Sequence, residues 1–228
     1  MRGLLILTSF PVRLAFYGLL HGVALHAIVV TIKKNGPSIL NENGPFEWVH
    51  FGLMVISGAV FLWNWRRNSV YPTVLFFCSM VSFIAALREL DQYSEILLFE
   101  HAYQFPAGAI GVLTVYYMWN GRQTLRQEIS AFMKQPPFFF LAFGFFLAAV
   151  VAQILGQREL WHAVIETPSA RLAKRVFEET IETIGYYLTV FFGAIETSYK
   201  TKSWAVRVVG DSVEVEQTNV NHGQGCEI

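Results

Sequence analysis

Six long apolar segments constrain what this chain can fold into. Crossing the hydrocarbon core of a bilayer takes about 20 apolar residues in a helix, and a helix satisfies its backbone hydrogen bonds internally. Each segment is 18 to 20 residues long. The sequence therefore predicts an all-α membrane protein, folded as a six-transmembrane-helix bundle with spans at 14–32, 46–65, 70–87, 102–119, 136–155 and 177–196.

The composition agrees with a membrane location. Of the 228 residues, 54% are hydrophobic and 15% are charged, whereas about 25% of a soluble domain is charged. The formal net charge is zero, which offers a nucleic acid no electrostatic attraction. The expected partner is the lipid bilayer, while protein partners and oligomeric state stay open.

The distribution of basic residues predicts the orientation. With six spans both termini share one side, which carries ten Lys and Arg residues against seven on the other. Cytoplasmic loops carry the excess of basic residues, so both termini are predicted to be cytoplasmic, in a cell membrane of the bacterial inner type. The predicted regions are a cytoplasmic or interfacial lead-in at 1–13, the transmembrane domain at 14–200 and a cytoplasmic tail at 201–228. Alternating residues around Gly210-Asp211 predict a β-hairpin at 205–216, followed by a disordered end.

Acidic residues and histidine enter two of the predicted spans. Between the first charged turns and the basic inner end, the second span has only 13 apolar residues, 51–63, and the sixth has 13, 183–195. Thirteen helical residues cover roughly 20 Å of a core of about 30 Å. The charged turns that hold Glu47, His50, Glu179 and Glu182 are therefore predicted to lie just below the outer interface and to face the bundle.

The spacing of these residues predicts a metal site. Glu47 and His50 are three apart, as are Glu179 and Glu182, so each pair shares one face of its helix. Helical bundles hold di-iron and di-manganese centres with Glu-x-x-His and further glutamates. A divalent or iron-type metal ion is thus the expected cofactor, with Glu47, His50, Glu179 and Glu182 as its ligands. Further candidate ligands are Glu178, His26, His101 and His162.

The end of the third span adds candidate catalytic residues at the same level. Arg88, Glu89 and Asp91 follow its apolar segment, and Arg88 could pair with Glu89 or orient an anionic headgroup or substrate. The hypothesis is a metal-dependent membrane enzyme that acts on a lipid or a small periplasmic substrate.

Three alternatives remain open. One is a non-catalytic membrane assembly or accessory protein. In it, Glu47, Glu178 and Glu179 lie at helix N-termini, where the helix dipole stabilises negative charge. Another is a proton-coupled transporter, since acids inside a membrane are frequent in such proteins. Haem is disfavoured, because His21 and His26 are about 140° apart around a helix and no haem motif is present.

Overall fold

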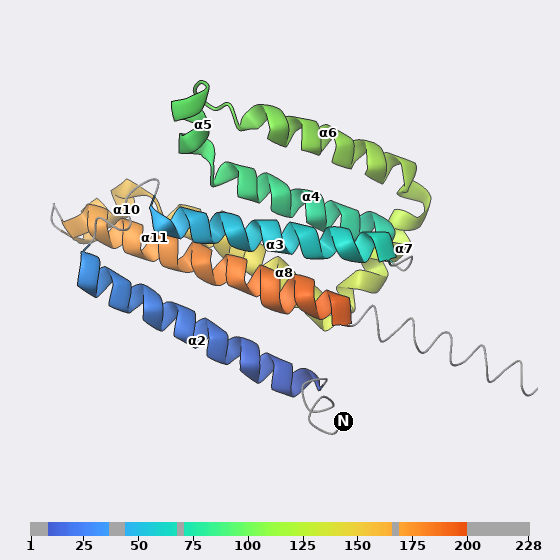
Figure 1. Ribbon diagram of the computed structural model, residues 1–228, viewed down its shortest axis with the longest axis horizontal. Coiled ribbons are helices and arrows are strands. Elements are labelled where there is room, and N and C mark those ends of the chain that lie inside the picture. The colour runs from blue at the N-terminus through green and yellow to red at the C-terminus, as the bar shows by residue number, and fades with distance from the viewer. Residues whose placement is uncertain (1–8, 37–43, 68–70, 166–168, 200–228) are drawn as a thin grey trace, which may run out of the picture.

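The computed structural model describes residues 9–36, 44–67, 71–165 and 169–199 (Figure 1). Within these ranges the elements are helices and no strand occurs, which confirms the all-α prediction for this part of the chain. The predicted hairpin at 205–216 lies outside the described residues. In chain order the elements are α2 (Phe10–Asn35), α3 (Pro45–Arg67), α4 (Pro72–Arg88), α5 (Asp91–Leu97), α6 (Gln104–Asn120), α7 (Arg122–Met133), α8 (Pro136–Phe146), η2 (Leu147–Val151), α9 (Ala152–Leu155), α10 (Arg158–Val164), α11 (Ser169–Tyr187) and η3 (Leu188–Ile195).

Among the described residues, three helices are long and apolar enough to cross a membrane. They are Phe10–Asn35, Pro45–Arg67 and the continuous helix Pro136–Leu155, which comprises α8, η2 and α9. The helix Pro72–Arg88 is apolar but shorter, with 17 residues. Large apolar side chains such as Leu19, Val112 and Phe139 lie on the outside of the molecule, where a soluble protein would expose polar groups. The chain is therefore a helical membrane protein.

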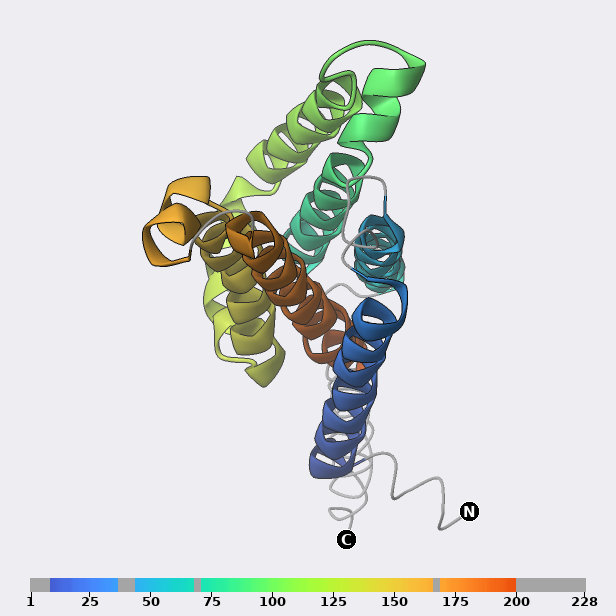
Figure 2. The same ribbon diagram turned by 90° about the vertical axis from the view of Figure 1, so that its left-hand side faces the viewer.

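Helices α3, α4 and the long α11–η3 helix form the centre of the bundle. Helix α3 packs along α4 and also against α11 and η3, while α8 and η2 pack on the other side of the α11–η3 helix. Helix α6 covers α4 from outside, and α2 contacts α11 and η3 at the edge, as the end-on view in Figure 2 shows. Met54, Ala86, Ala148, Tyr186 and Val190 pack together in a buried cluster that joins α3, α4, η2 and the α11–η3 helix.

Two glycines allow α8 and α11 to approach closely. A Cβ atom on Gly185 would lie 2.5 Å from the carbonyl oxygen of Gly144, and one on Gly144 would lie 2.6 Å from that of Gly185. Membrane helices use small residues in this way to bring their backbones together. The contact holds the region around Gln153 in α9 beside the acidic part of α11.

The N-terminus of α4 is capped by a side chain from another helix. The Glu128 carboxylate, on α7, accepts hydrogen bonds from the backbone N–H groups of Thr73 and Val74, at 2.8 and 3.2 Å, and from the Thr73 hydroxyl at 3.0 Å. The Thr124 hydroxyl donates a fourth bond at 2.9 Å. The first N–H groups of a helix have no partner within that helix, and a carboxylate suits their partial positive charge.

Replacing Glu128 with alanine is expected to lower the free energy of unfolding by about 2 kcal/mol, because two buried N–H groups lose their acceptor. Equilibrium unfolding in detergent micelles measures this change. The neighbouring exposed residue provides a matched control, and Gln127→Ala should leave the unfolding curve nearly unchanged. Equal curves for the two variants would contradict the capping role.

Candidate metal centre

The centre of the site is His50, in the second turn of α3. Pro45 begins this helix, at a position where its missing N–H costs no hydrogen bond. The His50 side chain is fully buried, and its ring lies against the ring of Tyr186, with centroids 5.2 Å apart. A buried imidazole must find partners for both ring nitrogens, so the surroundings of each nitrogen decide what the residue does.

One ring nitrogen of His50 is fixed by Thr183. Its Nε2 lies 2.7 Å from the Thr183 hydroxyl oxygen, and this hydroxyl donates its own proton to the Glu179 carbonyl, also at 2.7 Å. The Thr183 oxygen therefore accepts a hydrogen bond from the Nε2–H group. Neutral His50 then carries its lone pair on Nδ1, and that nitrogen is buried without a hydrogen-bond partner among the described residues.

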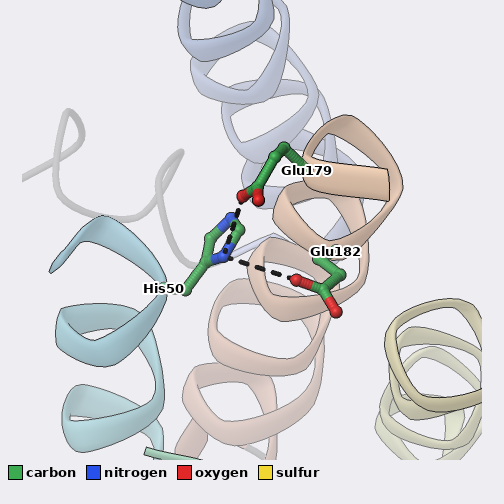
Figure 3. A group of neighbouring side chains, drawn as sticks. All are labelled: His50, Glu179 and Glu182. Carbon is green, nitrogen blue, oxygen red and sulfur yellow. Dashed lines mark ion pairs between the residues drawn. The ribbon is translucent and has the colours of Figure 1, made fainter. Parts of the chain in front are cut away.

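Three carboxylates surround the Nδ1 atom of His50. The nearest oxygens are Oε2 of Glu89 at 3.5 Å, Oε2 of Glu182 at 3.7 Å and Oε2 of Glu179 at 3.9 Å. Figure 3 shows His50 on one helix facing both glutamates of α11. The Glu179 Oε2 atom is likewise buried without a hydrogen-bond partner in the described part of the chain.

Arg88 supports this group from the end of α4. Its Nη2 atom donates to Oε1 of Glu89, to Oε1 of Glu182 and to the Tyr186 hydroxyl, each at 3.0 Å. The Tyr186 hydroxyl in turn donates to Oε1 of Glu89 at 2.8 Å, and the Gln153 amide donates to Oε1 of Glu182 at 3.3 Å. These bonds use the Oε1 atoms, so Oε2 of both carboxylates is left to face His50.

The charges of the site do not cancel when His50 is neutral. If all three are ionised, Glu89, Glu179 and Glu182 contribute three negative charges, while Arg88 and Arg175, which lies 3.9 Å from Glu179, contribute two positive ones. Burial raises the pKa of the Glu89 carboxyl, but a protonated His50, together with Arg88 and Tyr186, outweighs burial and holds that pKa below its ordinary value. A further positive charge, either a proton on His50 or a metal ion, is therefore stabilised at the site.

The donor atoms have separations that suit a metal ion. Ligand atoms of His50, Glu179 and Glu182 all lie within 4.8 Å of one another. A tetrahedral ion with bonds of about 2.1 Å places its donors about 3.4 Å apart. The distances from Nδ1 to the carboxylate oxygens exceed this by a few tenths of an ångström, which small side-chain rotations can supply. One imidazole nitrogen with carboxylate oxygens is a donor set found with zinc, iron and manganese.

The structure brings five of the residues singled out from the sequence into one group: His50, Arg88, Glu89, Glu179 and Glu182. Asp91 lies in a second, more exposed group with Glu95 and His101, since α5 begins there and leaves the bundle axis. The His101 Nδ1 atom is 4.0 Å from Asp91 and 3.6 Å from Glu95.

The remaining candidate ligands lie in other surroundings. Glu47 is half-buried one turn before His50, and Glu178 pairs with Lys174 at 3.4 Å. His26 is exposed on α2, and His162 is exposed in α10.

Thr183, Tyr186 and Gln153 belong to the site but were not among the residues expected from the sequence. Thr183 follows Glu179 by four residues and Tyr186 follows Glu182 by four, so both share a helix face with an acidic residue. That spacing could have indicated them. Gln153 carries no such signal, because its position depends on the close contact between α8 and α11.

Comparisons with protein-family models, with curated proteins and with solved structures return no match. The site therefore has to be interpreted from its own geometry.

Proposed function

We propose that this chain is a six-span protein of the bacterial inner membrane, with cytoplasmic termini, and that its buried polar site binds a divalent metal ion. As a metal-dependent enzyme it acts on a lipid or a small periplasmic substrate. A metal ion bound there would polarise a substrate oxygen or activate a water molecule. The number of spans rests on the six apolar segments of the sequence. The orientation rests on the excess of Lys and Arg on one side.

One observation carries the metal proposal. The lone pair on Nδ1 of His50 and the Oε2 atom of Glu179 are buried, face each other and lack hydrogen-bond partners within the described residues. Buried polar atoms are costly when they have no partner. A cation between them removes this cost and also offsets the excess negative charge of the three carboxylates.

Arg88 is the member of the site best placed to meet a substrate. Its side chain is 39% exposed, whereas those of His50, Glu89, Glu179 and Glu182 are each less than 10% exposed. A guanidinium group recognises phosphate and carboxylate groups through several donors at once. An anionic substrate group would therefore contact Arg88, with Glu89 beside it. Asp91, at the start of α5, would act from the edge of this region.

Elemental analysis of the purified full-length protein tests the proposal. The expected result is close to one zinc, iron or manganese ion per chain for the wild type, and loss of that ion in His50→Ala and in Glu182→Gln. The matched control is His26→Ala, which removes an exposed histidine on α2 and should leave the metal content unchanged.

Two outcomes would contradict a metal site. One is a wild-type protein that stays free of metal after equilibration with Zn²⁺, Fe²⁺ and Mn²⁺ in turn. The other is an equal metal content in the wild type and in both site variants.

A second candidate is a membrane assembly or accessory protein in which the same residues only join helices. The observation that favours it is the set of contacts between Arg88, Glu89 and Glu182, which links α4 to α11 without any added ion. In that case His50 holds a proton on Nδ1 instead of a metal. A metal-free protein that retains the His50 proton, observed by NMR of labelled histidine, would select this candidate. A proton-coupled transporter would additionally show a proton flux in liposomes that Glu182→Gln abolishes.

A further inference from the structure

An apolar cavity lies at the other end of the bundle from His50. It has a volume of about 410 Å³ and is enclosed by α4, α6, α7 and α8. Its walls are formed by apolar side chains, including Val74 and Cys78 of α4, Met118 of α6 and Leu141 of α8. An apolar cavity of about 150 Å³ already accepts a benzene molecule, and ligand pockets usually fall between about 300 and 1,000 Å³.

The cavity opens toward the lipid-facing side of the molecule. Phe77, Ile129 and Met133 line it and are 40%, 40% and 55% exposed. Ala142, a further lining residue, is exposed on α8. The exposed residues at the opening are apolar, so a bilayer around the bundle would offer it acyl chains.

Helix α7 gives the opening a polar, basic border. Its apolar residues Leu125, Ile129, Phe132 and Met133 line the cavity. Arg126 lies three residues before Ile129 and therefore on the neighbouring stripe of the helix. The polar face of α7, which includes Arg126, borders a shallow depression of about 640 Å³ that is lined by Tyr71, Arg126, Gln127, Ser130, Ala131, Lys134 and Gln135. An amphipathic helix of this kind lies in the interface between headgroups and acyl chains.

Arg126 and Lys134 are both exposed, and among the described residues no acidic side chain lines this depression. The charge there is positive, next to an opening that accepts hydrocarbon. We propose that this region binds an anionic phospholipid, with one acyl chain in the apolar cavity and the phosphate at Arg126 and Lys134. This site is separate from the metal site and does not rest on the function proposed for it.

Native mass spectrometry of the full-length protein in detergent, titrated with phosphatidylglycerol or phosphatidylcholine, tests the lipid site. We expect the wild type to bind one phosphatidylglycerol more tightly than phosphatidylcholine. Removing one basic side chain near an anionic headgroup should weaken binding about fivefold, so Arg126→Gln should lose most of this preference. The matched control is Arg66→Gln, an exposed arginine at the end of α3.

Filling the mouth of the cavity tests the acyl chain separately. Ala142→Phe should reduce the binding of both phospholipids, whereas Ala149→Phe, at an exposed position of η2 outside the cavity lining, should not. Glycerol 3-phosphate, which has the phosphate but no chain, should not compete. Equal binding of the two phospholipids, or wild-type binding by Arg126→Gln and Ala142→Phe, would mean that only annular lipid contacts this surface and would overturn the proposal.

Discussion

Replacing Thr183 with valine is expected to weaken metal binding about 10- to 100-fold, the usual effect of losing a group that orients a metal-ligating histidine. Valine keeps the shape of threonine but removes the hydroxyl that accepts the His50 Nε2–H bond. Without this hydroxyl, an imidazole proton on Nε2 has no hydrogen-bond acceptor from residue 183, so the Nδ1–H tautomer becomes more favourable. On Nδ1 the proton lies near three carboxylates, at 3.5 to 3.9 Å, and there it occupies the position proposed for the metal.

Competition with a chelating indicator for Zn²⁺ or Mn²⁺ measures this affinity. Thr183→Ser retains the hydroxyl and should bind as the wild type does. Thr189→Val is the matched control, because the buried Thr189 hydroxyl donates to the Gly185 carbonyl, away from His50. If Thr183→Val and the wild type bound metal equally, Nδ1 of His50 would not be a ligand, and a purely structural network would be the better interpretation.

The second large effect is expected at the opposite end of the bundle, where Arg13 and Glu196 form a buried ion pair. The Arg13 Nε and Nη2 atoms lie 2.6 and 2.9 Å from the two oxygens of Glu196, and the Tyr17 hydroxyl donates to Oε1 at 3.1 Å. Arg13→Met leaves the Glu196 carboxylate buried without its cation. We expect the free energy of unfolding to fall by about 3–5 kcal/mol.

Equilibrium unfolding in mixed detergent micelles measures the change in the free energy of unfolding. A double variant then tests whether the unpaired charge causes it. Arg13→Met with Glu196→Leu removes both charges and should recover much of the stability, since the cost comes from the unpaired carboxylate. Arg67→Met removes an exposed guanidinium that stacks on Trp63 and should change the curve little. A double variant as unstable as Arg13→Met would show that packing of the arginine stem, not charge, holds α2 in place.

Hydropathy and turn residues predicted the long apolar helices, but they did not predict α5, α7 and α10. The segment predicted at 136–155 corresponds to the continuous helix Pro136–Leu155, and the second predicted span lies within α3. Helices α4 and α6 are shorter than a full span, because each has 17 residues and extends about 26 Å, against a hydrocarbon core of about 30 Å. The sequence pattern gives the length of an apolar segment, but the position of the bilayer around it depends on the packed bundle.

Part of the site could be predicted because helical spacing is local. The pair Glu179 and Glu182 shares a face whatever the rest of the fold does. The short apolar segment of the second span indicated that His50 lies at the same depth as these glutamates. The end of the third span placed Arg88 and Glu89 at that depth too. Asp91 shows the limit of that reasoning, since it lies two residues beyond Glu89 in sequence yet belongs to α5 and contacts His101.

The ion pair between Arg13 and Glu196 could not be predicted. The two residues are 183 positions apart, and neither belongs to a motif. Their contact depends on the approach of α2 to η3, which is a property of tertiary packing. The same holds for the hydrogen bonds from α4 to Glu128, which join residues 54 and 55 positions apart.

The positions of the site residues along the chain determine the order in which they are synthesised. His50 and Glu89 come from helices that pair directly as neighbours in the chain, but Thr183 is 133 positions after His50, and Glu182 is 94 after Arg88. During synthesis from the N-terminus, the α3–α4 hairpin exists before α11 has left the ribosome. The site therefore stays incomplete until α11, which supplies Glu179, Glu182 and Thr183, has been synthesised.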